Sequence, residues 1–537
     1  MFELIKIIFS LRDNASKNQN TNKNPTAFNY ENIKISHLLN NNRDIIKLIF
    51  NNCSDLIIRE VKITNNPNIS AMLVYIDNMV TTEIVEETII KKLIYKNENF
   101  TYNPGSLEYS KYLLGINNKY IYTDMKMVVD SILSGNVLLF INGLSQALVI
   151  NVKNPPSRNI EEPDVESVIR GPREGFTESL STNVALIRKR IKSTHLKIEP
   201  FILGRETKTN IKIAYLSNIA NPKIVNEVKE RLTKIDIHAV LGLNYIKEYI
   251  EDEPLSNFPT IFSTEKPDVA AGKILEGRVA ILTDGTPLAI TVPAIFMEFL
   301  TTSEDYYLKF IAATINRWIR YISFIFSLTL PGAYVAITTF HQELIPTPLL
   351  SSFVKARSGI PFPGLMECIL MLFVYEILRE AGVRMPRAVG QAVSVVGALV
   401  LGQAAVEAGI ASTATVIVVS LTAIASFTTP VPDMYEAVRP IRFIFTLLGG
   451  SLGLLGLICG ILMLFMRLIS LRSFGIPYLE PLAPFISSEL PDVFMRRPIW
   501  AKFKRPWFIT GKQSIQAKQT NHLEAINKEK DNTSQDN

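Results

Sequence analysis

Residues Phe443–Met466 read FIFTLLGGSLGLLGLICGILMLFM, a run that contains no Lys, Arg, Asp or Glu. A helix of about 20 apolar residues can cross the hydrocarbon core of a bilayer, which is roughly 30 Å thick. Three further segments of comparable length are equally free of charge: Tyr321–Phe340, Ala388–Val406 and Ala408–Thr429. The alternative, a buried helical bundle of a soluble protein, rarely contains such long uncharged helices. The sequence therefore predicts an integral membrane protein.

A fifth apolar segment, Gly364–Glu380, is interrupted by carboxylates. Its uncharged stretch, Cys368–Tyr375, lies between Glu367 and Glu376, and a carboxylate inside hydrocarbon is costly. The segment is either a re-entrant or interfacial helix, or a span that its neighbours shield. Basic residues crowd the chain after the last span, which places that tail in the cytoplasm. No secretory signal precedes the N-terminal region, so we expect an even number of crossings and prefer four spans plus one helix that does not cross.

The composition fits a soluble region of about 300 residues joined to a membrane block. Hydrophobic residues make up 47% of the 537, and the net charge is only +6. That charge gathers near the membrane flanks, which indicates a lipid surface as partner and no nucleic acid. The three cysteines are far apart and the five histidines lack metal-ligand spacing. We therefore expect no disulfide framework, no metal and no cofactor.

The N-terminal half alternates between helix and strand patterns. Residues 1–30 include a polar Asn/Lys-rich linker that cannot bury enough surface to order itself, so we predict a disordered or amphipathic N-terminus. Hydrophobic spacing then predicts a helix, two strands and a second helix, in the order Leu38–Phe50, Leu56–Ile63, Ala71–Ile76 and Thr82–Leu93.

This half also contains an internal repeat. Ile132–Gly143 reads ILSGNVLLFING, and Ile274–Gly285 answers it position by position with ILEGRVAILTDG. Each copy predicts a helix end, a strand, an Asn-Gly or Asp-Gly turn and a second strand. The alternative is a chance likeness of two hairpins, but looser matches precede each copy and pair Arg59–Lys62 with Arg205–Lys208 and Asn78–Glu87 with Asn218–Glu227. We predict two related α/β subdomains, over 31–153 and 196–300.

Residues 154–195 form a connector that is rich in proline and charge. Thr177 can cap a helix with Leu180, Val184 and Ile187 on one face, and four cations end that helix. Two interpretations stay open: a linker with a basic helix, or a docking or switching element that faces lipid head groups or a partner. The candidate interaction residues are Pro156, Ser157, Arg158, Glu161, Arg170, Gly171, Pro172, Arg173, Glu174, Gly175 and Phe176.

The predicted membrane domain covers 301–471 with four to five apolar segments, and a basic cytoplasmic tail, disordered at its end, covers 472–537. Pro331 and Gly332 should kink the first span. Small residues in the later spans, including Gly449xxxGly453 and Gly456xxxGly460, allow helix backbones to approach closely, which indicates tight packing or oligomerisation.

Several polar side chains lie within or beside these apolar segments. Such residues usually face a bundle interior or water. The alternative is that the acids pair with Arg379, Arg384 or Arg387 at the head-group boundary. The membrane candidates are Glu367, Glu376, Arg379, Gln391, Gln403 and Glu407.

Long motifs in collinear order carry a resemblance. They are the connector motif from Pro156 to Glu178, Leu330–Tyr334 with Thr339–Pro346, Glu376–Arg387 and Gly390–Val406. Together they resemble the A subunit of bacterial spore germinant receptors of the GerA type, over roughly residues 50–500. The fold class that we expect is an α/β N-terminal region of two related subdomains followed by an all-α polytopic membrane domain.

The resemblance implies a multi-pass subunit in the inner membrane of a dormant spore. It implies assembly with a transporter-like B subunit, which binds the nutrient, and with a lipoprotein C subunit. In that picture the A subunit transduces nutrient binding into the start of germination with ion release, as a homo-oligomer around an ion-conducting path.

Two other functions compete with signal transduction. A solute transporter that carries amino acids or ions itself usually shows repeats within its membrane block, whereas the repeat found here precedes the apolar segments. An enzyme is not expected, because the sequence holds no P-loop, HExxH, GxSxG or Rossmann fingerprint.

Overall fold

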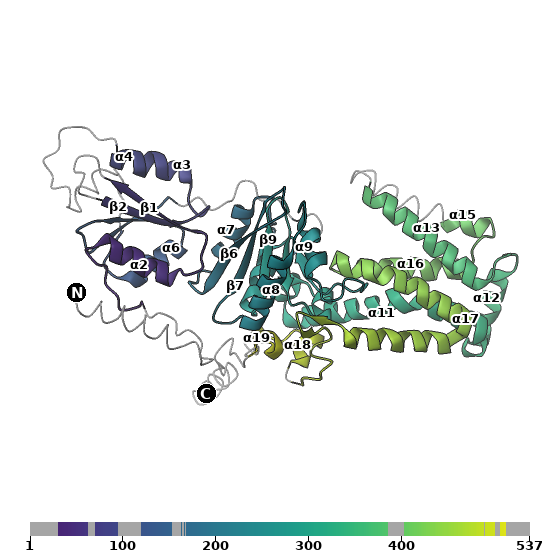
Figure 1. Cartoon of the computed structure of the whole chain (residues 1–537). Helices are drawn as coiled ribbons and strands as arrows, with labels where there is room; N and C mark the ends of the chain where they lie inside the picture. The colour runs from purple at the N-terminus through teal and green to yellow at the C-terminus, as the bar shows by residue number, and fades with distance from the viewer. Residues whose placement is uncertain are drawn as a thin grey trace, which may run out of the picture. The chain divides into compact units, whose positions relative to one another are not determined.

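The computed structural model describes residues 30–62, 70–94, 120–152, 163, 166, 168–384, 402–487, 489–499 and 505–511. The chain forms two compact units. The first comprises Met1–Asn51 and Leu56–Asn154, and the second comprises Asn52–Asp55 and Pro155–Asn537. Each unit contains a five-stranded sheet, and the second also contains the apolar helices (Figure 1).

The first unit is an antiparallel sheet with helices packed on it. Its strands follow the order β1-β2-β4-β5-β3. Leu73, Leu139 and Ile150 are buried in the core between the sheet and the helix that follows β2. The elements are α2 (Leu39–Ile49), β1 (Leu56–Lys62), β2 (Ser70–Ile76), α3 (Thr82–Ile84), η2 (Val85–Ile90), α4 (Lys91–Ile94), β3 (Tyr120–Tyr122), α6 (Met125–Leu133), β4 (Val137–Ile141) and β5 (Ala147–Ile150).

The second unit begins with a sheet of the same design. Its strands follow the order β6-β7-β9-β10-β8, which matches the first sheet strand for strand. The elements are α7 (Leu180–Arg190), β6 (Leu196–Leu203), β7 (Thr209–Leu216), α8 (Pro222–Lys234), α9 (Leu243–Ile250), β8 (Phe262–Thr264), α10 (Pro267–Leu275), β9 (Val279–Thr283) and β10 (Ala289–Val292).

The predicted repeat is thus present in the fold. Strands β4 and β5 recur as β9 and β10 with every boundary shifted by the same interval, and the helical stretch 82–94 recurs as α8. Gly143 and Gly285 occupy the hairpin turns with φ of 93° and 76°, a region that favours glycine. One match was wrong. Arg59 lies inside β1, whereas Arg205 lies in the turn between β6 and β7, so the two residues have different places in the sheet.

The helix predicted inside the connector, α7, is part of the second repeat. Its Leu186 and Ile187 are buried against Ala214 and Leu282 of the sheet. The same local bond pattern opens α2 and α7. Asn42 is bonded to the backbone of Ser36 at 2.8 and 2.7 Å, and Asn183 is bonded to Thr177 at 2.8 and 2.6 Å.

Two details of α7 differ from the prediction. Ser179, and not Thr177, is the N-cap, because its hydroxyl accepts a hydrogen bond from the Thr182 backbone NH. Arg188 is not a solvated cation at the helix end. It is buried and donates two hydrogen bonds of 2.9 Å to Asp55, which belongs to the same unit.

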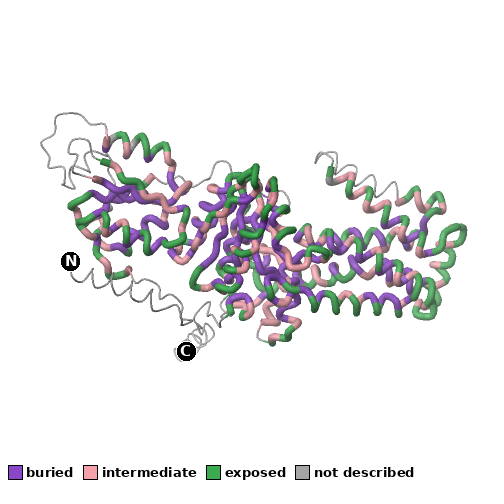
Figure 2. Tube along the Cα trace, in the orientation of Figure 1, coloured by how far each residue is buried: buried purple, intermediate pink, exposed green. Residues whose placement is uncertain are grey.

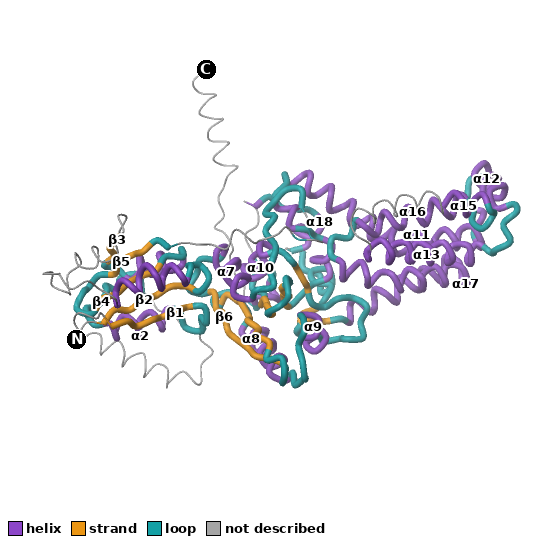
Figure 3. The backbone as a smooth tube through the Cα atoms, turned by 90° about the horizontal axis from the view of Figure 1, so that it is seen from above, coloured by secondary structure: helices purple, strands orange, loops and turns teal. Residues whose placement is uncertain are grey.

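Beyond the sheet the chain continues as helices that run side by side (Figure 3). Within the described residues, α11 and the 39-residue stretch α17, which turns at Gly453, are long and apolar enough to cross a membrane, and α16 is a shorter apolar helix. The elements are η3 (Phe296–Leu300), η4 (Ser303–Tyr306), α11 (Phe310–Phe340), η5 (Gln342–Leu344), α12 (Thr347–Arg357), α13 (Gly364–Arg384), α15 (Gly402–Glu407), α16 (Thr413–Phe427) and α17 (Pro432–Ser470).

The predicted spans map onto these helices unequally. Tyr321–Phe340 lies within α11, and Ala408–Thr429 is represented by the shorter α16. The doubtful segment Gly364–Glu380 forms α13, which packs against α11, α16 and α17. Most of Ala388–Val406 lies outside the described residues. Large apolar side chains such as Leu452, Leu455 and Met463 are more than half exposed, which fits contact with lipid. Exposed and buried positions alternate along the apolar helices (Figure 2).

Helix α17 is two helices joined by a reversal at Gly453. This residue has φ 64° and ψ −149°, outside the helical region. In a straight helix Phe445 and Gly460 would lie about 22 Å apart, yet a Cβ on Gly460 would be 3.2 Å from the Phe445 ring. The two legs therefore run antiparallel (Figure 1). The prediction of one continuous span over Phe443–Met466 was wrong, because the glycine-rich stretch forms a turn.

After α17 the chain returns to the second sheet. A short hairpin, β11 (Arg472–Ser473) and β12 (Ile476–Pro477), places Phe474 and Ile476 in the hydrophobic core beneath β7, β9 and α8. Two short helices follow, α18 (Leu490–Phe494) and α19 (Trp507–Thr510). The second sheet is thus completed by residues that come after the apolar helices.

Candidate functional site

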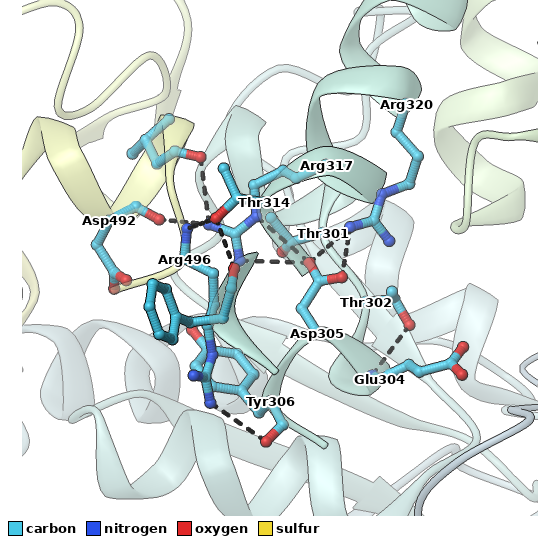
Figure 4. A network of polar contacts seen from close by, with 12 residues as sticks. Thr301, Thr302, Glu304, Asp305, Tyr306, Thr314, Arg317, Arg320, Asp492 and Arg496 are labelled. Carbon is cyan, nitrogen blue, oxygen red and sulfur yellow. Dashed lines mark hydrogen bonds and ion pairs between the residues drawn. The ribbon is translucent and has the colours of Figure 1, made fainter. Parts of the chain in front are cut away.

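The base of α11 is held by a buried ionic network (Figure 4). Arg317 and Arg320 lie three residues apart on one face of α11, and both reach Asp305 of η4. Arg320 donates to both carboxylate oxygens at 2.6 Å, and Arg317 donates to one of them at 3.3 Å. The side chains of Asp305 and Arg317 are each 1% exposed. The network fixes the point where the chain passes from the soluble part into the first apolar helix.

The segment that follows the last apolar helix is bonded to the same face of α11. Arg317 donates to the carbonyl oxygens of Asp492 and Val493, and the indole NH of Trp318 donates to Phe494 at 2.8 Å. These carbonyls belong to α18, whose last carbonyls have no partner within the helix. The start of the first apolar helix and the chain beyond the last one are therefore joined.

The hairpin β11–β12 is fastened to the second sheet by buried hydrogen bonds. The Ser473 hydroxyl donates to the Thr260 carbonyl at 2.6 Å and accepts from the Ala294 backbone NH at 3.0 Å. The Tyr478 hydroxyl donates to the Pro259 carbonyl at 2.7 Å. These bonds join the residues flanking β8 and β10 to the chain that directly follows α17.

A cavity of about 900 Å³ lies where these elements meet. Its wall comes from α10, from η3 and η4, from the turn between α16 and α17, and from the chain after α17. Volumes of about 300 to 1,000 Å³ are typical of small-molecule sites. The lining residues that matter below are Glu166, Phe262, Lys266, Asp268, Gly272, Met297, Val431 and Tyr435.

One polar end of the cavity contains Glu166, Lys266 and Asp268. Lys266 is 1% exposed, donates to the Ser303 hydroxyl at 3.1 Å, and lies 3.7 Å from Asp268. Glu166 accepts a hydrogen bond of 2.6 Å from Thr264. Burial raises the pKa of Glu166 to about 7, against the opposing effect of that hydrogen bond. Burial is also the main cause of the raised pKa of Tyr307, whose hydroxyl contacts Asp268.

The first part of the connector motif lies against η4. The Arg170 backbone NH donates to Glu304 at 3.2 Å. Gly171 has φ 131°, and a Cβ at this position would lie 2.9 Å from the Tyr307 ring. Both the backbone conformation and the close ring explain why glycine stands here.

The second part of the motif is bonded to α7 and β8. Glu174 forms ion pairs with Lys189 at 3.0 Å and Arg190 at 2.7 Å, and the buried Phe176 donates its NH to the Glu265 carbonyl at 2.7 Å. Pro172 is half-buried, Arg173 is exposed and Gly175 is buried. The remaining candidates of the connector, Pro156, Ser157, Arg158 and Glu161, lie outside the described residues.

Among the membrane candidates, Glu376 and Arg379 are brought together with two further arginines. Glu376 lies 3.2 Å from Arg379, 3.1 Å from Arg439 and 3.5 Å from Arg442. Arg442 also donates to the Ser327 carbonyl of α11 at 2.7 Å. This cluster links α11, α13 and α17. Glu376 thus pairs with Arg379, as the alternative stated for the acids allowed. It also pairs with Arg439 and Arg442, which the sequence did not indicate as partners.

The other membrane candidates are separate from this cluster. Glu367 is buried and accepts 2.6 Å hydrogen bonds from the backbone NH and hydroxyl of Ser412, the N-cap of α16. Its nearest cation is Arg357 at 3.9 Å, so it does not pair with Arg379 or Arg384. Gln403 donates to Glu407 at 2.9 Å on an exposed face of α15. Gln391 lies outside the described residues.

No group of three His, Cys, Asp or Glu side chains suited to a metal ion occurs in the ranges that the structure describes. The network and the cavity present ion pairs and hydrogen-bonding groups. This geometry can connect elements and can hold a ligand.

Comparison with known proteins identifies the family. The profile described as Bacillus/Clostridium GerA spore germination protein matches residues 44–508. Spore germination protein KA of Bacillus subtilis is 45% identical over 86% of this chain and 85% of its own length, and spore germination protein B1 is 36% identical over 88% and 98%. The chain belongs to the GerA family of spore germination proteins.

Two further proteins are similar to this chain. The membrane protein YfkQ of Bacillus subtilis is 42% identical over 88% of this chain and 91% of its own length. A crystal structure of the N-terminal domain of the A subunit of the Bacillus megaterium germinant receptor GerK3 matches 49% of this chain and 98% of that chain, with 34% identity and a TM-score of 0.40. The GerA family is a family of germination proteins and no known class of enzyme.

Sequence reasoning missed several residues of this GerA chain. Asp305 and Arg317 looked like ordinary flanking charges, and Arg442 looked like a loop cation. One feature of the sequence could have indicated the network. Arg317 and Arg320 are spaced to lie on one helix face, and Asp305 shortly precedes them. For Ser473 the sequence gives no signal, because its partners lie far away along the chain.

Proposed function

We propose that this chain is the membrane subunit of a nutrient germinant receptor. It would respond to nutrient binding in its partners and pass the change to its apolar helices. Membership of the GerA family supports a role in germination. The observation that carries the relay is the double attachment of the helices to the second sheet, through the Asp305 network at the start and the β11–β12 hairpin at the end.

The proposed assembly includes a transporter-like B subunit, a lipoprotein C subunit, membrane lipid and further copies of this chain. We place it as a multi-pass protein in the inner membrane of the spore. The exposed apolar faces of α11 and α17 support insertion into lipid. A carrier that moves solute itself is less well supported, since the repeat consists of the two sheets and not of the apolar helices.

Deletion of the gene tests the assignment to a nutrient receptor. Spores without the chain should lose the response to at least one nutrient and should still germinate with a chemical trigger that bypasses the receptors. Spores that respond to every nutrient at the normal rate would refute the assignment.

The relay is tested with Ser473→Ala. This change removes the hydroxyl that bonds both Thr260 and Ala294, so movement of the sheet should reach α17 less effectively. We expect normal amounts of the chain in the spore membrane but ion release that is several-fold slower after nutrient addition. Ser470→Ala is the matched control, because that hydroxyl bonds only its own helix in the described residues. Equal rates for the two variants would contradict the relay.

The ion-conducting path is the finer part of the proposal. Purified chain in liposomes, alone or with its partners, should conduct monovalent ions. Glu407 and Gln403 form an exposed polar pair on α15, and Glu407→Gln and Gln403→Leu should reduce the flux. Unchanged ion flux and germination in both variants would remove the pore assignment.

A further inference from the structure

The cavity of about 900 Å³ is not used by the proposed relay, and its charges are unbalanced at one place. Two of its ion pairs are matched, since Lys273 pairs with Glu298 at 2.8 Å and Arg278 pairs with Glu276 at 2.6 Å. The imbalance lies at the other end of α10, where two carboxylates share a single ammonium.

That group is Glu166, Asp268 and Lys266. Lys266 reaches Ser303 at 3.1 Å and lies 3.7 Å from one oxygen of Asp268. The other oxygen, Asp268 Oδ1, is buried and accepts no hydrogen bond in the described part of the chain. The Asp268 side chain is only 7% exposed. A buried carboxylate oxygen that no protein group satisfies is available to accept a hydrogen bond from water or from a ligand in the cavity.

The rest of the wall is largely apolar. Phe262 of β8, Ile295 and Met297 next to and within η3, Val431 before α17 and Val493 of α18 all line the cavity. A complementary ligand therefore needs an apolar body and one cationic hydrogen-bond donor. A carboxylate or phosphate placed beside Asp268 would meet its negative charge and is disfavoured at this end of the cavity.

We propose that this cavity binds a small organic amine, whose ammonium pairs with Asp268 and Glu166 and whose apolar body lies between Met297 and Val431. Binding of an amine to this chain is a property beyond the receptor function proposed above. It can be measured on the purified full chain without its partners.

A bound ligand would affect the ion-pair cluster around Glu376 through Tyr435. This residue lines the cavity, and its ring lies 4.6 Å from the guanidinium of Arg379 and 5.9 Å from that of Arg439. Both arginines pair with Glu376. A bound amine would thus contact the soluble part and the start of α17 together.

Gly272 provides a variant that narrows the cavity beside Asp268 without removing a charge. It lies in α10 and lines the cavity, and a Cβ at this position meets nothing within 4 Å. Gly272→Leu should fold, because leucine favours helix more than glycine does, and its side chain should occupy the space of the ligand.

The test measures binding of hexylammonium to the purified full chain in detergent by calorimetry, with hexanoate and hexanol as probes of equal chain length. We expect binding of hexylammonium alone, at least tenfold weaker binding to Asp268→Asn, and weaker binding to Gly272→Leu. Glu230→Gln, which removes an exposed carboxylate of α8, is the control and should bind as the unaltered chain does.

Equal binding of hexylammonium to all variants would show partition into the micelle and would overturn the proposal. Binding of hexanoate as tight as that of hexylammonium would overturn the choice of an amine. Should Asp268→Asn fail to fold, Gly272→Leu decides, because its added side chain lies one helical turn from Asp268. Binding as tight as that of the unaltered chain would then overturn the proposal.

Discussion

At the scale of single residues, Glu480 is a carboxyl group in an unfavourable place. It follows β12 and is fully buried. It lies near Glu489, whose carboxylate accepts a hydrogen bond from the Trp507 backbone NH. Burial raises the pKa of Glu480 to about 8, with a smaller contribution in the same direction from Glu489 and an opposing one from Arg278. The folded chain therefore holds this proton more tightly than the unfolded chain does.

A pH dependence of stability follows. Because the pKa of Glu480 is higher in the folded state, the stabilisation from its proton is fully present below about pH 4.5 and is lost as the pH rises through about 8. The slope in that interval is at most about 1.4 kcal/mol per pH unit. Thermal unfolding of the purified chain in detergent should show a melting temperature that falls between pH 5 and pH 8.

Glu480→Gln should flatten this slope, since glutamine stays neutral across the range. Glu248→Gln, an exposed change on α9, should keep the slope of the unaltered chain. An unchanged slope in Glu480→Gln would assign the effect to another group.

At the scale of elements, α11 and α17 cross through glycines. A Cβ on Gly449 would lie 2.3 Å from the Gly332 carbonyl oxygen, and a Cβ on Gly332 would lie 2.5 Å from that of Phe445. The two backbones therefore touch, as small residues allow in membrane helices. Pro331 precedes this contact within α11.

Gly449→Ala should separate the two helices. The added methyl group meets a backbone atom that cannot move aside, and overpacking of this kind costs about 1–3 kcal/mol. We expect a lower melting temperature in detergent and less resistance to dissociation of the helices by denaturant.

Gly402→Ala is the matched change in α15, where a Cβ meets only the Val416 side chain at 3.5 Å. It should leave the melting temperature unchanged or slightly higher, because alanine favours helix. If the two variants melt alike, the contact between Gly332 and Gly449 is not close in the folded protein.

The sequence predicted close glycine packing but not its partners. The spacing Gly449xxxGly453 looked like one packing face, whereas Gly449 packs on α11 and Gly453 turns the chain. Hydropathy cannot separate these roles, because a reversal inside an apolar run leaves the run apolar. In contrast, the hairpins of the repeat were predicted well, since their turns require residues such as Asn-Gly and Asp-Gly that mark them in the sequence.

At the scale of the whole second unit, the chain leaves the sheet at α11 and comes back to it after α17. The reversal at Gly453 adds a return leg that the predicted four spans did not include. Positions 384, 436 and 470 lie at the end of the helical part that is near the second sheet. Positions 355, 408 and 451 lie at the opposite end of the helical part. Glu380 faces Arg439 near the sheet, whereas Gly409 approaches Gly359 at the far end.

Labelling of single cysteines in sealed membrane vesicles tests this arrangement. In a chain without Cys53, Cys368 and Cys459, cysteines at the first three positions should react from the same side as one at Glu248, which lies in the soluble part. Cysteines at the other three should react only from the opposite side. Labelling of positions 451 and 470 from one side would disprove the reversal.

The candidate site was less predictable than the fold. Polar residues in apolar surroundings drew attention to Glu376 and Arg379, which form an ion pair in the structure. The network of Asp305, Arg317 and Asp492 and the cavity beside it depend on segments far apart in the chain, and no local pattern records which distant segments meet. Only the folded arrangement brings these residues together.

The return of Phe474 and Ile476 to the core of the second sheet has a consequence for biogenesis. The last strand of that sheet, β10, leaves the ribosome long before these two side chains do, because all the apolar helices are translated in between. At roughly 5–20 residues per second the sheet would wait on the order of 10 s or more with part of its core open. The helices must be inserted during that interval, so a chain that stops before Phe474 would present the cell with a translated but unfinished domain, an obvious substrate for proteolysis.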